Sequence, residues 1–565
     1  MNLLEIADLR IGFTDLPEQD VLKGINLSIP HASITGLVGE SGSGKTITAY
    51  SILKLLDVKA KLRTGSISFD NGNQIVNLLN LESEALRKIR GHQITMVFQE
   101  AMAAMNPVLK CGFQVSEVVK AHFNLSKSEI KDQTFEAFLK VGLEDPQRIY
   151  NSYPFELSGG QIQRVLIALA IINKPKLIIA DEPTTALDVN MQKKVLDLFK
   201  EIHAELGSSI LFISHDLGLV KDLCHQISVM RYGQIVESGS VNDVFNKPKH
   251  PYTRGLLHCK PPLTQKLKKL FTLNDFIEST DEKTKPVENY SVEELKSKNK
   301  QLQDSAELLS VQNLSIQYDT RSDFFLRKKQ KHIAVSDVSF SIKQGEVLGL
   351  VGESGSGKTS IGRCIVRLLN PEKGHIRYLG EDILTLSGSA LLPLRKEIQM
   401  IFQDPYSSLN PRQKIGEAIQ EPLEIHKLHG HSKQRKDRAM ELLNIVGMET
   451  HHYDRYPHQF SGGQRQRICI ARALSVEPKL LVCDEPVSAL DVSVQAQILN
   501  LFKELQEKFK LSYLFISHDL AVVHFIADRI IVLQNGAIVE EGFSSQVISH
   551  PQNKYTQSLL NATPQ

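Results

Sequence analysis

The sequence lacks the features that mark several large classes of proteins. No stretch approaches the ~18 uninterrupted apolar residues of a membrane-spanning helix. Glu5 and Asp8 interrupt the apolar N-terminal stretch, which argues against a secretory signal. The six cysteines form no CxxC pair and no His/Cys cluster with zinc spacing. The 66 basic and 64 acidic side chains leave a net charge of only +2, without the basic excess of a dedicated nucleic-acid binder. We therefore expect a cytoplasmic chain with reduced cysteines.

What the sequence does contain is a tandem repeat. With 565 residues, of which 41% are apolar and 23% charged, the chain is long enough for about two to four globular domains. The motif GESGSGKT occurs twice, and three further motifs follow it in the same order in each half. These motifs are LSGGQ at Leu157–Gln161 and FSGGQ at Phe460–Gln464, DEPTTALD at Asp181–Asp188 and DEPVSALD at Asp484–Asp491, and FISHDL around His215 and His518.

The spacing of the two copies locates an insertion. Glu182 and Glu485 are 303 residues apart, whereas Lys45 and Lys358 of the GESGSGKT motifs are 313 apart. The first copy therefore has about ten extra residues, mostly between GESGSGKT and the VFQE segment that ends at Glu100. We expect this insertion on the surface and not in the core.

A charged segment separates the copies. It spans about 259–306, contains no glycine, mixes lysines with acidic residues, and predicts a helix near Val292–Gln303. The predicted organisation is thus a first domain at 1–258, a connector at 259–306 and a second domain at 307–565.

Each copy reads as an α/β domain. ITGLVG and VLGLVG are short apolar runs that lead into the glycine-rich motifs, and KLIIAD and KLLVCD are apolar on both faces, as buried parallel strands are. After each glycine-rich motif, apolar residues follow helical spacing and predict a helix with one buried face. These residues are Ala49, Ile52, Leu53 and Leu56 in the first copy and Ile361, Cys364, Ile365 and Leu368 in the second.

The GxxxxGK[ST] pattern predicts a phosphate-binding loop. Glycines let backbone N–H groups surround phosphate oxygens, and the following helix N-terminus adds partial positive charge. Lys45 and Lys358 would reach the β- and γ-phosphates, and Thr46 and Thr359 would place a hydroxyl on Mg²⁺. The candidate nucleotide-binding residues are Gly39, Glu40, Ser41, Gly42, Ser43, Gly44, Lys45 and Thr46, with Gly352, Glu353, Ser354, Gly355, Ser356, Gly357, Lys358 and Thr359 in the second copy.

An Asp-Glu pair follows a buried strand in both copies. Asp181 and Asp484 suit the carboxylate that holds the metal shell, and Glu182 and Glu485 are placed to polarise an attacking water. A lone Asp-Glu pair could also be a solvated strand end. Its position directly after a buried strand in both copies favours the catalytic interpretation.

The order of these motifs, with Gln99 or Gln403 after the phosphate loop, resembles the ATP-binding cassette family over nearly the whole chain. The resemblance implies two P-loop nucleotide-binding domains, each with a RecA-like core, a helical signature subdomain and an antiparallel β subdomain. It also implies that the two cassettes pack head to tail, with each ATP between the phosphate loop of one and the SGGQ segment of the other. An SGG segment that opens a helix can approach a γ-phosphate closely. In this arrangement it serves the phosphate that the partner cassette holds, so one chain with two cassettes would supply both halves of the pair.

The resemblance further assigns roles to individual residues. Lys45 would share a nucleotide with Ser461, Gly462, Gly463 and Gln464, and Lys358 with Ser158, Gly159, Gly160 and Gln161. Gln99 and Gln403 would sense the γ-phosphate through Mg²⁺, His215 and His518 would contact that phosphate, and Asp188 and Asp491 would cross between the cassettes. Phe13 and Tyr318 are candidates for stacking on adenine, or are plain strand aromatics. Both copies keep lysine, glutamate and histidine, so two competent ATP sites are expected; Phe460 in place of the usual signature leucine should not remove activity.

Finer motifs resemble one branch of the family. FQEAMAAMNPV, FQDPYSSLNPR, HPYTRGLL and, more weakly, HPQNKYTQSLL look like the ATPases of peptide and nickel importers, and the fused form is similar to single-chain ATPases of glutathione and microcin C uptake. Such a chain would work at the cytoplasmic face of the inner membrane with two permease subunits and an external solute-binding protein. The region between Gln99 or Gln403 and the signature would dock the permease, with Pro107 and Pro411 either breaking helical regularity there or only shaping a turn. Because only Cys259 stands after HPYT, we expect no iron–sulfur cluster in this tail.

Two other classes of cassette protein remain as alternatives. Ribosome-acting tandem cassettes resemble this architecture, but they typically read Asn-His where this chain has Thr185-Ala186 and Ser488-Ala489, and they carry a longer, strongly basic connector. Drug exporters and repair cassettes carry fused membrane spans or a long coiled insertion, which this sequence lacks.

Overall fold

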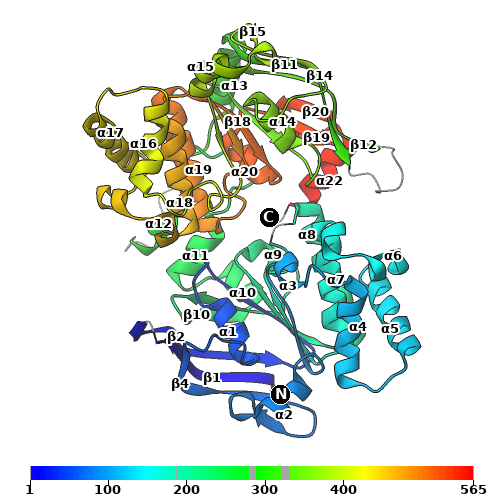
Figure 1. Cartoon of the computed structure of the whole chain (residues 1–565). Helices are drawn as coiled ribbons and strands as arrows, with labels where there is room; N and C mark the ends of the chain where they lie inside the picture. The colour runs from blue at the N-terminus through cyan, green and yellow to red at the C-terminus, as the bar shows by residue number, and fades with distance from the viewer. Residues whose placement is uncertain (1, 15, 186, 279–287, 321–329, 564–565) are drawn as a thin grey trace.

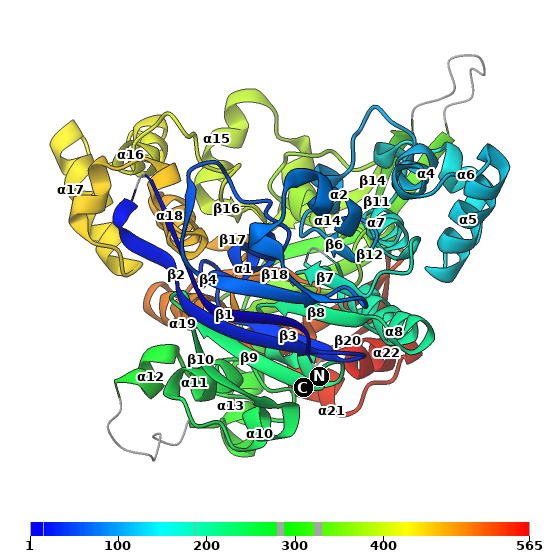
Figure 2. The same cartoon turned by 90° about the horizontal axis from the view of Figure 1, so that it is seen from below.

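The computed structural model describes residues 2–14, 16–185, 187–278, 288–320 and 330–563, and it contains two lobes of the same architecture (Figure 1). Each lobe has one six-stranded and one four-stranded sheet. The helices near the two signature motifs, α4–α6 (residues 111–151) in one lobe and α16–α17 (residues 415–445) in the other, project toward opposite sides of the molecule in both Figure 1 and Figure 2. The predicted tandem α/β fold is confirmed.

The six-stranded sheet carries the candidate site in each lobe. In the first lobe its order is β10-β9-β3-β8-β7-β6, and only β10 runs antiparallel to its neighbour. β3, β7 and β8 are buried at every position because helices cover one face of the sheet and the four-stranded sheet with α1 (Lys45–Ile52) covers the other, which explains their unbroken apolar runs. The bounds are β3 Ile34–Val38, β6 Ile94–Val97, β7 Leu177–Asp181, β8 Ser209–Ser214, β9 Gln226–Arg231 and β10 Gln234–Ser240.

The second lobe repeats this order as β16-β17-β18-β13-β19-β20. The strands are β13 Val347–Val351, β16 Ile398–Ile401, β17 Leu480–Asp484, β18 Ser512–Ser517, β19 Arg529–Gln534 and β20 Ala537–Phe543. Because parallel strands share one carboxyl edge, the residues after β3, β7 and β8, and those after β13, β17 and β18, lie together.

The four-stranded sheets are antiparallel, in the orders β2-β1-β4-β5 and β12-β11-β14-β15. In the first lobe these strands are β1 Asn2–Phe13, β2 Leu16–Pro30, β4 Ala60–Asp70 and β5 Ile75–Asn77. In the second lobe they are β11 Glu307–Thr320, β12 Gln330–Lys343, β14 Lys373–Tyr378 and β15 Glu381–Asp382.

Helices complete the first lobe. α1 Lys45–Ile52 follows the phosphate loop, and α7 Gly159–Ile171 begins at the signature motif. The others are α2 Ser83–Ile89, α3 Ala101–Ala104, α4 Cys111–His122, α5 Lys127–Lys140, α6 Pro146–Asn151, α8 Val189–Leu206, α9 Leu217–Lys221, α10 Val241–Asn246 and α11 Pro251–His258.

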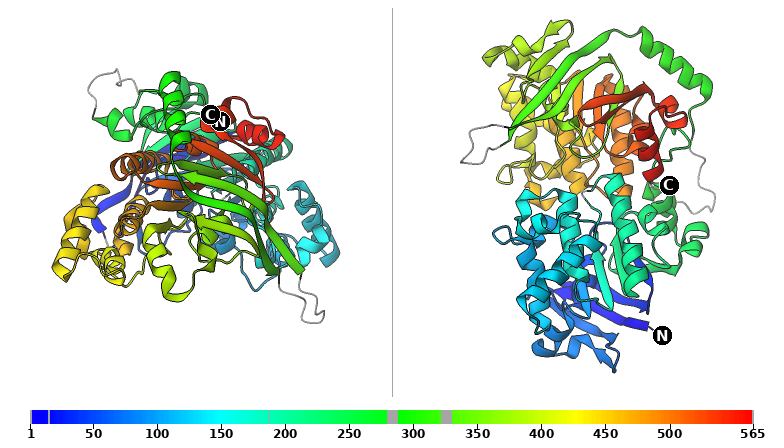
Figure 3. Two further views of the ribbon diagram at one scale, coloured as in Figure 1. Left: turned by 90° about the horizontal axis from the view of Figure 1, so that it is seen from above. Right: turned by 90° about the vertical axis from the view of Figure 1, so that its right-hand side faces the viewer.

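The second lobe has counterparts of these helices except α3 and α6. They are α14 Lys358–Ile365, α15 Leu391–Glu397, α16 Ile415–Ile425, α17 Ser432–Ile445, α18 Gly462–Leu474, α19 Val492–Phe509, α20 Leu520–Ile526, α21 Ser544–Ser549 and α22 Lys554–Ala562. α22 lies beside α8 of the first lobe, as the view from above and the view from the side show (Figure 3).

Part of the insertion lies on the surface, whereas one residue predicted to be buried is exposed. Some of the extra residues of the first copy lie in the largely exposed stretch at 54–65, which agrees with the predicted surface position. The predicted burial of Leu368 is wrong, since this side chain is 58% exposed. The helix ends at Ile365, and Arg367 adopts a positive φ of 57°, so helical spacing no longer governs where Leu368 points.

The connector packs against the second lobe. Its helix α13 Val292–Asp304 lies where the sequence predicts it, and a short helix, α12 Leu273–Ile277, precedes it. The side-chain amide of Asn500 donates to the carbonyl of Leu270 at 2.9 Å, and its oxygen accepts from the Leu270 N–H at 2.8 Å. These paired bonds fasten the connector to α19. Within the described residues, no helix combines the length and apolar character that a bilayer crossing requires.

Candidate nucleotide-binding and hydrolysis sites

The phosphate loop of each lobe joins the central strand to a helix. Gly44 caps α1 with a φ of 106°, a conformation that favours glycine, and Gly357 caps α14 at 103°. Lys45 is buried, and its Nζ donates to the carbonyls of Gly39 at 2.8 Å and Glu40 at 2.9 Å. Burial lowers the pKa of Lys45 despite the nearby carboxylates.

The second loop has the same geometry. Lys358 Nζ donates to the carbonyls of Gly352 and Glu353, each at 2.8 Å, and burial lowers its pKa as well. A Cβ on Gly42 or Gly355 would meet no other atom within 4 Å, so the tip of each loop is open. Both loops can therefore admit a phosphate chain without displacing protein atoms at this point.

Each loop threonine meets the aspartate at the end of a neighbouring strand. Thr46 Oγ1 donates to Asp181 Oδ1 at 3.3 Å, and Thr359 Oγ1 donates to Asp484 Oδ1 at 2.9 Å. Asp181 Oδ2 is buried and has no hydrogen-bond partner among the described residues. Burial raises the pKa of Asp181 to about 6 and also raises that of Asp484. A hydroxyl beside a buried carboxylate with an unpartnered oxygen fits Mg²⁺, a hard cation that prefers oxygen ligands.

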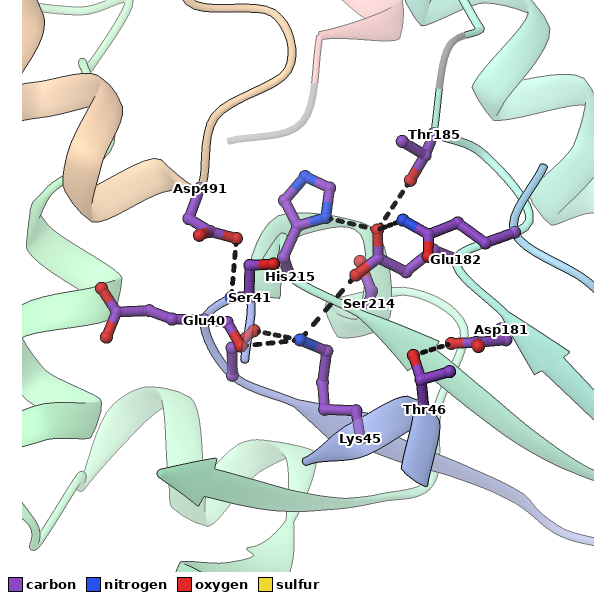
Figure 4. Close-up of polar contacts among 12 residues, drawn as sticks. Glu40, Ser41, Lys45, Thr46, Asp181, Glu182, Thr185, Ser214, His215 and Asp491 are labelled. Carbon is purple, nitrogen blue, oxygen red and sulfur yellow. Dashed lines mark hydrogen bonds and ion pairs between the residues drawn. The ribbon is translucent and has the colours of Figure 1, made fainter. Parts of the chain in front are cut away.

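Glu182 is the centre of the polar cluster in the first lobe (Figure 4). Its Oε2 accepts from Gln99 Nε2 at 3.1 Å, from Thr185 Oγ1 at 3.0 Å and lies 3.0 Å from His215 Nδ1. Its Oε1 lies 3.8 Å from Lys45 Nζ. Burial alone would raise the pKa of Glu182, but the hydrogen bond and charge of His215, together with the charge of Lys45 and the hydrogen bond from Thr185, hold this pKa below its usual value. The carboxylate is therefore ionised and available to a water molecule at neutral pH.

Glu485 occupies the equivalent position in the second lobe. Its Oε2 accepts from Gln403 Nε2 at 3.0 Å and lies 3.1 Å from His518 Nδ1, and its pKa is also lowered against the effect of burial. Ser488 differs from its counterpart Thr185 because its hydroxyl donates to the backbone carbonyl of Glu485. Glu182 and Glu485 have positive φ values of 46° and 47°, a strained conformation for glutamate that is typical of functional sites.

The two lobes touch each other at the phosphate loops. Asp491 Oδ1 of the second lobe accepts a hydrogen bond from the Ser41 N–H at 2.9 Å, and Ser493 Oγ donates to Glu40 Oε1. At the other loop, Asn190 Nδ2 donates to Glu353 Oε1 at 2.5 Å. Residues far apart in the sequence therefore complete the surroundings of each loop.

Asp188 behaves differently from Asp491. Its carboxylate accepts from the Met191 N–H at 2.9 Å and so caps its own helix, α8. It still acts across the interface by charge, because it opposes the effect of burial on the pKa of Lys358.

The signature residues form the starts of α7 and α18. Ser158 and Ser461 cap these helices in boxes with Gln161 and Gln464. A Cβ on Gly160 would lie 2.5 Å from Met191 Cε, and one on Gly463 would lie 2.3 Å from Val494 Cγ1, so glycine permits close packing on α8 and α19. Gly159 and Gly462 are exposed. In the described part of the chain, no hydrogen bond joins a signature segment to the opposite phosphate loop.

The two candidate adenine-stacking residues have different surroundings. Tyr318 lines a cavity of about 370 Å³ together with Gly357, Lys358 and Gln403, and its hydroxyl lies 2.9 Å from Ser360 Oγ. Phe13 is half-buried at the end of β1, opposite Ala60.

Two tyrosines that were not predicted from the sequence contact the phosphate loops. The Tyr252 hydroxyl accepts from the Glu40 N–H at 3.0 Å, and the Tyr555 hydroxyl accepts from the Glu353 N–H at 3.0 Å. A signal for them was present, because these tyrosines are 303 residues apart, the same offset that relates Glu182 to Glu485.

Comparison with known proteins agrees with this architecture. The family described as "ABC transporter" matches residues 22–185 and 335–488, and the family described as "Oligopeptide/dipeptide transporter, C-terminal region" matches residues 236–284. The chain is 41% identical over 570 residues to the glutathione import ATP-binding protein GsiA of Salmonella typhimurium, with 100% of this chain and 90% of the relative covered. It is also 41% identical over 574 residues to GsiA of Escherichia coli K12, with the same coverage.

Among solved structures, a dimeric ATP-binding cassette in a post-hydrolysis state with ADP and Pi is 29% identical to this chain. The match covers 42% of this chain and 99% of that one, with a TM-score of 0.39. The paired family matches and the full-length relatives settle the classification. The chain belongs to the ATP-binding cassette transporter family and is a tandem-cassette ATPase of that family.

Proposed function

We propose that this protein hydrolyses ATP to power the import of peptides or peptide-like solutes through a separate membrane permease. The match at 236–284 to the C-terminal region of oligopeptide and dipeptide transporters supports this substrate class, as do the glutathione-importing relatives. The cassettes would span 1–258 and 307–565, joined by the connector at 259–306.

We further propose that two ATP sites form head to tail between the lobes. The single observation that carries this arrangement is the hydrogen bond from the Ser41 N–H to Asp491, which brings the second lobe onto the first phosphate loop. In this proposal Lys45 serves the same ATP as the signature at Ser461–Gln464, and Lys358 serves the same ATP as Ser158–Gln161.

The chain's own residues would divide the work of hydrolysis. Glu182 and Glu485 accept a proton from the attacking water, and His215 and His518 keep these carboxylates ionised and oriented. Thr46 and Asp181, with Thr359 and Asp484 in the second site, would hold Mg²⁺, which when bound neutralises charge on the β- and γ-phosphates. Gln99 and Gln403 would connect the metal to the glutamates.

The permease would dock beside Gln99 and Gln403. Met102, Val108 and Phe113 are 53%, 75% and 45% exposed, and Tyr406 is 56% exposed at the equivalent place in the second lobe. Pro107 and Pro411 lie in turns outside the neighbouring helices, which favours the turn-shaping interpretation. Exposed apolar side chains near both glutamines would give two permease subunits a surface to bind. The protein would thus sit at the cytoplasmic face of the inner membrane, with an external solute-binding protein delivering the solute.

Reconstitution tests the proposal. Vesicles with the cognate permease, this protein inside and the solute-binding protein outside should accumulate a labelled peptide or glutathione only with ATP and Mg²⁺. Affinity purification from detergent-solubilised cells should recover multi-span membrane proteins. Recovery of ribosomal proteins without a permease would favour the ribosome-associated alternative and contradict the transport assignment.

A further inference from the structure

We propose that Tyr252 and Tyr555 are positioning residues that hold the phosphate loops and couple their geometry to contact between the cassettes. This proposal deepens the ATP-site assignment above and rests on it. It concerns residues that lie outside the phosphate-loop, signature and histidine motifs.

Each tyrosine supports one phosphate loop from behind. Tyr252, on α11, is fully buried, and its hydroxyl accepts the Glu40 N–H at 3.0 Å. The Arg231 guanidinium lies over the Tyr252 ring at 4.9 Å and restricts it by a cation–π contact. Tyr555, on α22, is 8% exposed and accepts the Glu353 N–H at the same distance. The N–H that each hydroxyl holds belongs to the residue after the first glycine of the loop, so the hydroxyl fixes where the loop turns away from the strand.

Glu40 joins three parts of the molecule. Its N–H donates to Tyr252, its carbonyl accepts from Lys45 Nζ, and its carboxylate accepts from Ser493 Oγ of the opposite lobe. Glu353 has the same set of contacts, with Tyr555, Lys358 and Asn190 of the opposite lobe. One glutamate in each phosphate loop is therefore hydrogen-bonded to the lysine and the tyrosine of its own lobe and to a residue of the opposite lobe.

The tyrosine-bearing helices also touch the opposite cassette. α11 contacts α19, the helix that begins beside Ser493, and α22 contacts α8, the helix that begins beside Asn190. If the lobes separate, Glu40 loses Ser493 at the same time as α11 loses α19. The tyrosine thus connects the approach of the second lobe to the shape of the loop that receives phosphate.

Nucleotide binding by single-site variants of the full chain tests this proposal. Lys358→Ala leaves the first site as the main binding site, and Lys45→Ala leaves the second. We expect Tyr252→Phe, which removes one hydrogen-bond acceptor, to raise the Kd of a fluorescent ATP analogue about fivefold in the Lys358→Ala chain. The same change should leave Kd unaltered in the Lys45→Ala chain. Tyr555→Phe should show the mirror-image pattern.

A buried tyrosine elsewhere provides the matched control. The Tyr513 hydroxyl donates to the Phe502 carbonyl at 3.0 Å within the second lobe, away from both loops. Tyr513→Phe removes an equally buried hydroxyl and should change neither Kd. Equal effects of Tyr252→Phe on both sites, or no effect on either, would overturn the positioning role alone. If the Lys45→Ala and Lys358→Ala chains each still bound the ATP analogue at two sites with wild-type Kd, the assignment of the ATP sites would be overturned as well.

A double variant tests the coupling between the tyrosine and the opposite cassette. Ser493→Ala removes the contact from the opposite lobe to Glu40 and should weaken binding at the first site only. Together with Tyr252→Phe it should cost clearly less than the product of the two single fold-changes, because both act through Glu40. Fully multiplicative effects would show that the tyrosine and the opposite cassette act independently, and would refute the coupling.

Discussion

The carboxylate of Asp491 accepts a hydrogen bond from the Ser41 N–H at 2.9 Å, although 450 positions separate the two residues in the chain. The contact places the second lobe directly on the first phosphate loop. In the proposed arrangement, the first ATP site therefore depends on both lobes.

Asp491→Ala should lower ATP turnover by about tenfold, because it removes the charged acceptor through which the second lobe holds the Ser41 N–H of the first phosphate loop. Steady-state kinetics over a range of ATP concentrations measure this loss. Asp197→Ala is the control, since Asp197 is 53% exposed on α8 and lies 3.8 Å from Lys200. Equal turnover of the Asp491 variant and wild type would refute a role for the cross-lobe contact.

The combined variant Glu182→Gln/Glu485→Gln should lose at least about a hundredfold in kcat, because both proposed bases become unable to accept a proton. ATP binding should persist, since glutamine keeps the size of the side chain. Glu205→Gln, at a 61% exposed glutamate paired with Lys140, should behave as wild type. Unchanged turnover in the double variant would show that these glutamates are not the bases.

The head-to-tail pairing predicts which variants damage the same site. Adding Ser461→Arg to Lys45→Ala should cost little residual turnover, because both changes affect the first site. Adding Ser158→Arg to Lys45→Ala should abolish turnover, because each site then carries one lesion. If each lobe instead closed around its own nucleotide, the order of the two double variants in an ATPase assay would be reversed.

Tyr318→Ala should weaken ATP binding at the second site by about tenfold, because a stacked aromatic contributes roughly 1–3 kcal/mol per base. Tyr318→Phe keeps the ring, loses only the contact with Ser360, and should bind nearly as well as wild type. Titration in the Lys45→Ala chain isolates this site. An equal loss in both variants would point to the hydroxyl instead of the ring.

Lys503 predicts a pH dependence of stability. Burial lowers the pKa of Lys503 to about 7, helped by the positive charges of Lys266 and Lys298. The unfolded chain therefore binds more protons than the folded chain between about pH 7 and the ordinary lysine pKa near 10.5, and the contribution of Lys503 to the free energy of unfolding rises across this interval.

Comparison with Lys503→Met isolates this effect. The slope contributed by one group is at most about 1.4 kcal/mol per pH unit. The melting temperature of wild type minus that of the variant should therefore increase from pH 7 to pH 9. A difference that stays constant, or falls, would contradict a neutral Lys503 in the folded protein. Lys503 Nζ donates to the carbonyls of Leu267 and Lys268. The Lys503→Met variant should therefore lose these hydrogen bonds between the connector and α19.

The sequence was sufficient to predict the fold class and the residues that gather at the sheet edge. Apolar runs such as KLIIAD indicate strands buried on both faces, and parallel strands bring the residues after them together. Helical spacing predicted α1 and α14 but failed at Leu368, because the helix stops before it. Phe13 and Tyr318 looked equivalent in the sequence, yet Tyr318 lines a cavity with its phosphate loop, whereas Phe13 is half-buried at the end of β1, opposite Ala60.

The sequence by itself determined the local chemistry of this protein: two glycine-rich loops, two lysines, two Asp-Glu pairs and two histidines at a repeated offset. Short-range backbone geometry and strand burial fix these features, and both are encoded within a few residues. Only the tertiary structure decided which distant residues meet them. Asp491 reaches Ser41 while Asp188 caps its own helix, and Tyr252 and Tyr555 hold the loops from behind. Such contacts depend on how the two lobes pack, and no local pattern in the sequence specifies that packing.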